Sequence, residues 1–129
     1  MTDTQIPDHL RYTDDHEWIE LEDDVATIGL TDFAQSELGD IVYVETPELG
    51  ATVVQGKAFG VVEAVKTVAD LYAPVSGEII EVNPLLIENP EIINSSAYEE
   101  GWILRVRVQD TSELSNLLDA QAYADHISA

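Results

Sequence analysis

The segment Val61-Val62-Glu63-Ala64-Val65-Lys66-Thr67-Val68-Ala69-Asp70-Leu71-Tyr72-Ala73-Pro74 places one lysine between two apolar, strand-like runs. Residues 59–63 and 68–72 have the composition of β-strands, so the pattern predicts a β-hairpin with Lys66 at its tip. The tip contains no glycine, but a type I turn tolerates such residues. Lys66 is one of only five basic residues in a chain with 26 acidic ones. The segment therefore indicates a lysine that another protein can reach, as a covalent attachment point requires.

The rest of the chain repeats this short-strand pattern. Alternating apolar and polar residues predict further strands at 25–30, 41–45, 78–82 and 102–108. Turn-forming residues separate them at 49–50, 55–56, 73–77 and 89–90. Within the third of these turns, Gly77 is predicted to supply a positive φ. Many short strands with regular turns indicate a mainly β fold, either a sandwich or a barrel.

Two helices are predicted. The first spans 32–38, because Thr31 or Asp32 can cap its start and Gly39 can end it. The second spans 112–125, with Thr111 or Ser112 as the cap. Its apolar face is formed by Leu114, Leu117, Leu118 and Ala122.

The 129 residues are predicted to form a single domain over 1–129, since no linker or low-complexity tract interrupts them. Residues 1–9 are expected to be a loosely ordered N-terminal segment. No apolar run is long enough to cross a bilayer, and the polar start lacks the features of a signal or transit peptide, so we expect a cytoplasmic protein. The chain contains no cysteine, which excludes disulfides, thiolate metal sites and cysteine nucleophiles.

The formal net charge of −21 restricts the partners. Nucleic acid and anionic membranes bind through Lys and Arg, so both are excluded as expected partners. The acids either provide a highly soluble surface, as in a salty cytoplasm, or steer the protein toward basic partners. Because they are spread along the whole chain, we favour general surface composition.

Lys66 has a second interpretation, as a catalytic lysine. That role requires a lowered pKa, whereas Glu63 and Asp70 favour the charged ammonium. The sequence shows no phosphate-binding glycine loop or nucleophile elbow, and His9 and His126 have no partner at metal-ligand spacing. We therefore predict a non-catalytic protein without a metal site.

Several motifs together give a resemblance to a known family. Glu63-Ala64-Val65-Lys66 and Asp70 to Asn83 closely resemble the lipoate-attachment segment of the glycine cleavage system H protein family. Further motifs of that family follow in the same order: His16-Glu17-Trp18, Ile28 to Asp32 with Ala34-Gln35, Leu38 to Val42, Pro47 to Gly50, Asn94-Ser95 with Tyr98, Gly101-Trp102, and Leu114 to Tyr123. The resemblance covers about Leu10 to Tyr123.

The resemblance implies a biotinyl/lipoyl-like β-sandwich (a hybrid barrel-sandwich) and a shuttle function. Lys66 would carry lipoate in amide linkage. The arm would take the aminomethyl group of glycine from a glycine decarboxylase to an aminomethyltransferase, and a dihydrolipoyl dehydrogenase would reoxidise it. Lipoate-attaching enzymes complete the implied partners, and we expect a monomer.

The resemblance also implies roles for individual residues. Glu17 and Asp70 match residues of the cleft that receives the loaded arm, where a carboxylate suits a primary amine. Glu63, Val65 and Thr67 flank Lys66 and are expected to take part in recognition of the attachment site.

Two positions depart from the family pattern. Ala64 stands where the family commonly has Ser, so a hydroxyl contact is lost. Phe33 stands where it often has His, so Phe33 is expected to pack and not to handle protons. His16 is the histidine nearest the expected cleft and is interpreted as structural.

Three related carriers are alternatives. A biotin carrier would have methionines beside its lysine, whereas the only methionine here is Met1. A lipoyl domain of a 2-oxoacid dehydrogenase is shorter and usually has an acid directly before the lysine, where this chain has Val65. An H-like relay that passes lipoyl or octanoyl groups to other enzymes stays open as the alternative function.

Overall fold

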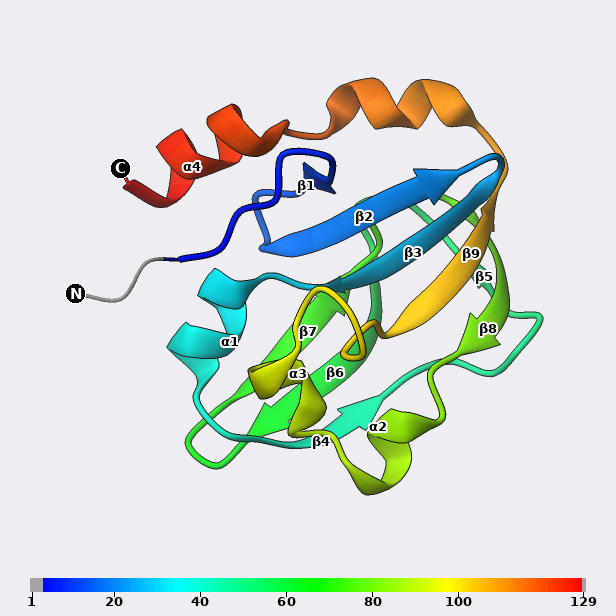
Figure 1. Cartoon of the computed structure of the whole chain (residues 1–129). Coiled ribbons are helices and arrows are strands. Elements are labelled where there is room, and N and C mark those ends of the chain that lie inside the picture. The colour runs from blue at the N-terminus through cyan, green and yellow to red at the C-terminus, as the bar shows by residue number, and fades with distance from the viewer. Residues whose placement is uncertain (1–3, 129) are drawn as a thin grey trace.

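Two antiparallel sheets pack against each other in the computed structural model, which describes residues 4–128 (Figure 1). The larger sheet has the order β1-β2-β3-β9-β8-β5. Its strands are β1 (Arg11–Tyr12), β2 (Glu17–Glu22), β3 (Val25–Leu30), β9 (Leu104–Val108), β8 (Gly77–Val82) and β5 (Thr52–Val53). The smaller sheet has the order β4-β6-β7 and consists of β4 (Ile41–Glu45), β6 (Ala58–Ala64) and β7 (Val68–Tyr72).

The main core lies between the two sheets. In the smaller sheet Val62 and Leu71 are almost fully buried, and they meet Ile28, Leu104 and Val106 of the larger one. A second apolar cluster, formed by Leu10, Tyr12, Trp18 and Tyr123, lies under the C-terminal helix. The fold is therefore a mainly β sandwich of two antiparallel sheets, as predicted.

The predicted strands are present within one or two residues of their expected ends. Strands β1, β2 and β5 were not predicted. β1 and β5 have two residues each, and three of the six residues of β2 are glutamates. One of those glutamates, Glu17, is buried, which is unusual for an ionisable residue.

Helix α1 (Asp32–Leu38) has the predicted bounds. The Thr31 side chain accepts a hydrogen bond from the Ala34 N–H, and Gly39 ends the helix at a φ of 82°. This positive φ is one that glycine adopts without steric cost. Two short helices, α2 (Leu85–Glu88) and α3 (Ile92–Ser95), were not predicted and lie on either side of the predicted 89–90 turn.

The prediction of one continuous helix over 112–125 is wrong. The structure has a 3₁₀ helix, η1 (Thr111–Asn116), then an extended break, then α4 (Ala120–Ser128). At the break, Leu118 exchanges both backbone hydrogen bonds with Tyr12, at 2.7 and 2.8 Å. Sheet-like pairing with β1 therefore interrupts the helical pattern, and α4 lies beside β1 (Figure 1).

The predicted N-terminal segment 1–9 lies partly outside the described residues. Of its described residues, Gln5 donates its N–H to Asp32 and accepts from the Tyr98 hydroxyl, and Pro7 accepts from Tyr12. Backbone hydrogen bonds thus connect Gln5 and Pro7 to the body of the fold.

The reason given for Gly77 is wrong, because its φ is not positive. A Cβ at position 77 would instead collide with the backbone carbonyl of Arg107 on β9. Close approach of two strands, and not turn geometry, makes a glycine necessary there.

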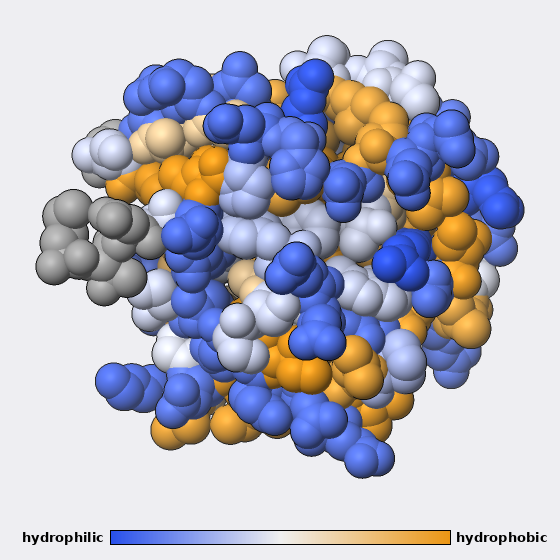
Figure 2. Space-filling model, in the orientation of Figure 1, coloured by the Kyte–Doolittle hydropathy of each residue, from blue (hydrophilic) through white to orange (hydrophobic). Residues whose placement is uncertain are grey.

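Polar side chains cover much of the surface (Figure 2), and apolar side chains form separate patches between them. Within residues 4–128, no helix combines the length and apolar character needed to cross a membrane.

Candidate functional site

The β6–β7 hairpin holds Lys66 at a tip fixed by backbone hydrogen bonds. The last strand pair is Glu63 with Val68. Beyond it, the Ala64 N–H donates to the Thr67 carbonyl at 2.8 Å, and the Val65 N–H donates to the Asp40 carbonyl at 3.0 Å. The first bond runs opposite to that of a type I turn, in which the carbonyl of the first residue accepts. The second attaches the tip to the loop before β4.

The tip is exposed as well as fixed. Lys66 and Thr67 are exposed, and Val65 and Val68 leave 70% and 62% of their surface in solvent. Among the described residues, Lys66 takes part in no salt bridge. Two exposed valines, Val65 and Val68, which we call the apolar collar, therefore flank an accessible ammonium group.

Glu63 and Ala64 lie on opposite faces of β6. Glu63 is half-buried beside its strand partners Tyr43 and Val68, both exposed. Ala64 is buried and opposite Ile41. Ala64, which stands where the family commonly has Ser, therefore faces the interior of the molecule. Glu63 lies on the accessible outer face.

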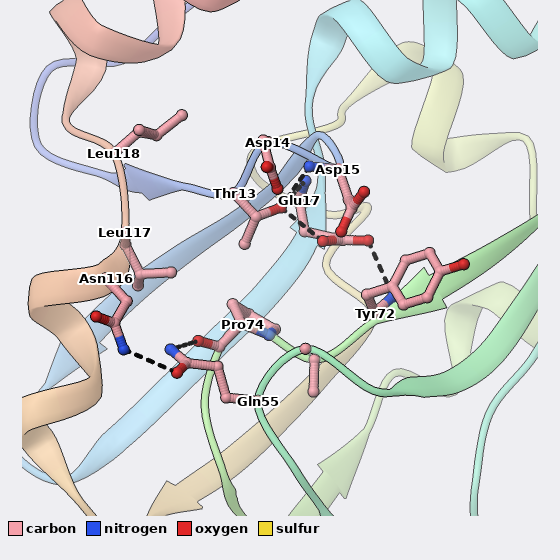
Figure 3. Close-up of a pocket in the computed structure, with 12 residues that line it drawn as sticks. Thr13, Asp14, Asp15, Glu17, Gln55, Tyr72, Pro74, Asn116, Leu117 and Leu118 are labelled. Carbon is pink, nitrogen blue, oxygen red and sulfur yellow. Dashed lines mark hydrogen bonds between the residues drawn. The ribbon is translucent and has the colours of Figure 1, made fainter.

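Glu17 lines a cavity that is open to solvent (Figure 3). Its carboxylate is 1% exposed and accepts two hydrogen bonds. The Thr13 hydroxyl donates to Oε1 at 2.6 Å, and the Tyr72 N–H on β7 donates to Oε2 at 3.0 Å. Glu17 thus connects the loop before β2 to the strand that leads away from Lys66.

Burial raises the pKa of Glu17 from its ordinary value of 4.5 to about 8. The bonds from Thr13 and Tyr72 favour the charged form and oppose this shift, and the nearby charges of Asp15 and Asp14 add to it. Burial also raises the pKa of Asp15, and Asp14 raises it further. Two carboxyl groups of the loop 13–17, those of Glu17 and Asp15, therefore have raised pKa values.

Asp70 is exposed and lines a different cavity, between the hairpin and α1. The hairpin contributes Val62 and Ala69, which face each other across β6 and β7. Most of the remaining wall is apolar and consists of Leu30, Phe33, Ala34 and Leu38, with Asp15, His16 and Glu37. We call this cavity the α1 groove.

The two acids expected to share a cleft do not line the same cavity. Asp15 lines both cavities, and Asp70 is two residues before Tyr72, whose N–H bonds to Glu17. The Glu17 cavity and the α1 groove are therefore neighbours along β7, with Asp15 between them. Lys66 lies outside both cavities, in the turn three residues before Ala69.

Several residues of this region, notably Thr13, Asp15 and Tyr72, were not predicted. Thr13 could have been identified from the sequence, because a hydroxyl group four residues before an acid can form a local hydrogen bond with it. Nothing in the sequence indicates Tyr72, because it bonds to Glu17 through a backbone N–H on a strand that is distant along the chain.

Phe33 packs against the His16 ring, with the ring centroids 4.9 Å apart. His16 also lies near two side chains of α4, Tyr123 and His126. Phe33 therefore fills space in the α1 groove, and His16 is the titratable ring in its wall. Among residues 4–128, no group of three or more His, Asp or Glu side chains is arranged to hold a metal ion.

The two-sheet fold with an exposed lysine at a hairpin tip defines a lipoyl-like β-sandwich. The model of the family described as glycine cleavage H-protein matches residues 10–129. The chain belongs to this family.

Individual relatives agree with this assignment. The glycine cleavage system H protein of Brevibacillus brevis is 54% identical over 119 residues, 92% of this chain and 94% of the relative. That of Bacteroides fragilis is 49% identical over 124 residues, 96% and 98% of the two chains. The crystal structure of a glycine cleavage system H protein from Mycobacterium marinum superposes with a TM-score of 0.86 at 39% identity, covering 96% of this chain and all of that one.

Proposed function

We propose that this chain, as one domain over 1–129, carries lipoate on Lys66 and shuttles the aminomethyl group of glycine. The observation that supports it best is the fixed but exposed tip, where Lys66 has no salt bridge among the described residues. Attachment turns the lysine into an amide and removes its charge. The protein acts as a carrier without catalysis of its own, which is consistent with its family.

The residues around the tip fit a lipoyl group. When bound, lipoate would supply a disulfide that is reduced as it accepts the one-carbon unit, and the dithiol left after that unit is released would be reoxidised. Val62 and Ala69, on the inner side of the same hairpin, line the largely apolar α1 groove. An apolar arm can leave water there without requiring new polar partners.

Carboxyl groups make part of the wall around the α1 groove and the Glu17 cavity polar. Asp70 and Asp15 can accept hydrogen bonds from a primary amine that reaches the α1 groove. Glu17 adds a buried acceptor in the neighbouring cavity and fixes the wall between them through Tyr72. In this proposal Glu63, Val65 and Thr67 form the surface that lipoate-attaching enzymes recognise.

The partners would be a glycine decarboxylase, an aminomethyltransferase and a dihydrolipoyl dehydrogenase, each acting on the arm of a monomeric carrier in the cytoplasm. These partners follow from the family to which the chain belongs. The exposed tip is the one place that all of them must reach.

Intact-mass measurement after incubation with a lipoate-attaching enzyme tests the attachment site. We expect a single lipoyl adduct, mapped to Lys66 by peptide mass. The variant Lys66→Arg should carry none, whereas Lys57→Arg, which changes the other exposed lysine, should be modified like the wild type. Modification at Lys57 or at the N-terminus would refute the proposal.

Glycine–bicarbonate exchange then tests the shuttle. Fully lipoylated protein should support the exchange with a glycine decarboxylase, and the Lys66→Arg variant should not. Absence of exchange with fully lipoylated protein would instead favour a relay of acyl groups to other enzymes.

A further inference from the structure

Helix α4 covers the loop 13–17 with two side chains, Tyr123 and His126, and Tyr123 is the buried one of the two. Tyr123 is 0% exposed, and its ring stacks on that of Tyr12 with 4.6 Å between centroids. Its hydroxyl lies 2.9 Å from Nδ1 of His16 and 2.8 Å from Oγ1 of Thr31. One hydroxyl thus joins three elements: α4, the loop before β2, and the N-terminus of α1.

The direction of each hydrogen bond follows from counting donors. Thr31 is also 0% exposed, and its Oγ1 already accepts the Ala34 N–H at 3.1 Å. Its own proton therefore needs an acceptor, and within residues 4–128 the only other polar atom bonded to it is the Tyr123 hydroxyl. A buried hydroxyl that lacks an acceptor is costly. Thr31 therefore donates to Tyr123.

This leaves the Tyr123 proton for His16. Tyr123 donates it to Nδ1, which must then be unprotonated, so the neutral ring carries its proton on Nε2. If Nδ1 also carried a proton, that proton and the Tyr123 hydroxyl proton would point at each other, with no acceptor between them. Tyr123 would then have to turn toward Thr31, whose proton would lose its acceptor. The network therefore opposes the charged imidazolium.

The surroundings of His16 act in both directions. Burial lowers its pKa most, and His126 of α4 lowers it further. Asp15 and Asp14 of its own loop and Glu37 of α1 favour the charged form. Tyr123 of α4 and Asp70 of β7 are the remaining titratable groups around the ring or in the wall of its groove. With acids on several sides, a histidine without this network would be easier to protonate.

We propose that Tyr123 is a positioning residue that holds His16 neutral, with its proton on Nε2, in the wall of the α1 groove. His16 lines the groove together with Asp15 and Asp70, so a neutral ring leaves the groove with acidic charge only. A charged imidazolium would repel an arm that ends in a protonated amine. A neutral His16 does not repel it. The consequence for the arm rests on the proposed function, whereas the protonation state of the ring does not.

Nitrogen-15 NMR of the histidine rings in the full-length, unmodified chain tests this directly. We expect the wild-type His16 to show a protonated Nε2 and an unprotonated Nδ1 throughout the neutral range. A wild-type spectrum with the proton on Nδ1 would overturn the proposal without any variant. The measurement needs no lipoate, so its outcome is separate from that of the attachment experiment.

Tyr123→Phe keeps the stacked ring and removes the hydroxyl. We expect the His16 tautomers to mix and its measured pKa to rise by about half to one pH unit, the equivalent of one hydrogen bond. Tyr12→Phe is the matched control: it removes the hydroxyl of the stacked partner, which bonds to the Pro7 carbonyl, and should leave His16 unchanged. An unchanged His16 in folded Tyr123→Phe, or an equal change in both variants, would show that packing alone sets the state of the ring.

Discussion

The hairpin tip and the loop 13–17 present ionisable groups in opposite ways. At the tip, Lys66 is exposed and has no salt-bridge partner among the described residues. In the loop, Glu17 is buried and both of its oxygens accept a hydrogen bond. The amine at the tip therefore stays accessible within the part of the chain that the structure describes, whereas hydrogen bonds hold the Glu17 carboxyl group in place in the loop.

The backbone shows the same difference. At the tip no residue has a positive φ, whereas His16 in the loop has a φ of 70°. A non-glycine residue in this region costs about 1–3 kcal/mol and persists where its neighbours fix it. Here the Thr31 N–H donates to the His16 carbonyl at 3.0 Å, and the His16 N–H donates to the Thr13 carbonyl at 3.2 Å. The loop is thus a strained, supported structure, and the tip is a relaxed one.

The largest effect is expected from Glu17→Ala. The change removes the acceptor of the Tyr72 N–H and of the Thr13 hydroxyl, so the free energy of unfolding should fall by about 2–4 kcal/mol. Urea denaturation measures it. Glu17→Gln retains an oxygen acceptor and should lose less. Equal, small losses in both variants would show that water satisfies these donors and that the loop is no better fixed than the tip.

The pH dependence of stability should separate Glu17 from exposed acids. Its pKa is about 8 in the folded protein and near 4.5 when exposed, so between these values the folded chain binds more protons. The free energy of unfolding should therefore fall as the pH rises from about 4.5 to 8, by at most about 1.4 kcal/mol per pH unit. Below 4.5 and above 8 this contribution does not change.

Glu17→Gln removes that titration and provides the reference for it. The difference in unfolding free energy between wild type and Glu17→Gln, measured at intervals across this range, should follow the predicted fall. A difference that is flat or rises with pH would mean that Glu17 is ionised in the folded protein, stabilised by the Thr13 and Tyr72 donors.

At the tip, a change should affect recognition and not folding. Val65→Ser and Glu63→Gln should each lower kcat/KM for lipoate attachment about five- to tenfold, because an accessible interface contact is typically worth about 1 kcal/mol. Val54→Ser, which changes an exposed valine ahead of the start of β6 and away from the tip, is the control and should have no effect. Attachment that is equally efficient in all three variants would remove the collar from the proposed recognition surface.

The smallest effect is the stability of the same tip variants. Val65→Ser and Lys66→Gln should change the free energy of unfolding by less than about 0.5 kcal/mol, because both side chains are exposed. Thermal and urea denaturation give the value. A loss above 1 kcal/mol would show that the tip contributes to the fold and would weaken its contrast with the loop.

Much of the fold could be predicted from local pattern. Helix α1 was predicted with its bounds because Thr31 and Gly39 mark its ends chemically. The C-terminal helix was not, because Leu118 pairs with Tyr12 from the opposite end of the chain. A requirement for glycine at position 77 was predicted, but for the wrong reason. The requirement comes from the nearby Arg107 carbonyl and so depends on how two strands approach each other.

The candidate site divides in the same way. The sequence identified Lys66, because a lone base between two strand-like runs is a local signal, and motif context drew attention to Glu17 and Asp70. It gave no sign that these two acids line separate cavities with Asp15 between them. It also gave no sign of Tyr123, which lies 107 residues from His16 along the chain.

The sequence by itself therefore determined the strands other than β1, β2 and β5, together with the hairpin and the lysine at its tip, because these follow from the order of neighbouring residues. Only the tertiary structure decided which groups are buried and which hydrogen bonds they make. Those properties set the protonation of Glu17 and the proton position on His16. They arise when loop, β7 and α4 meet, and no short stretch of sequence contains all three.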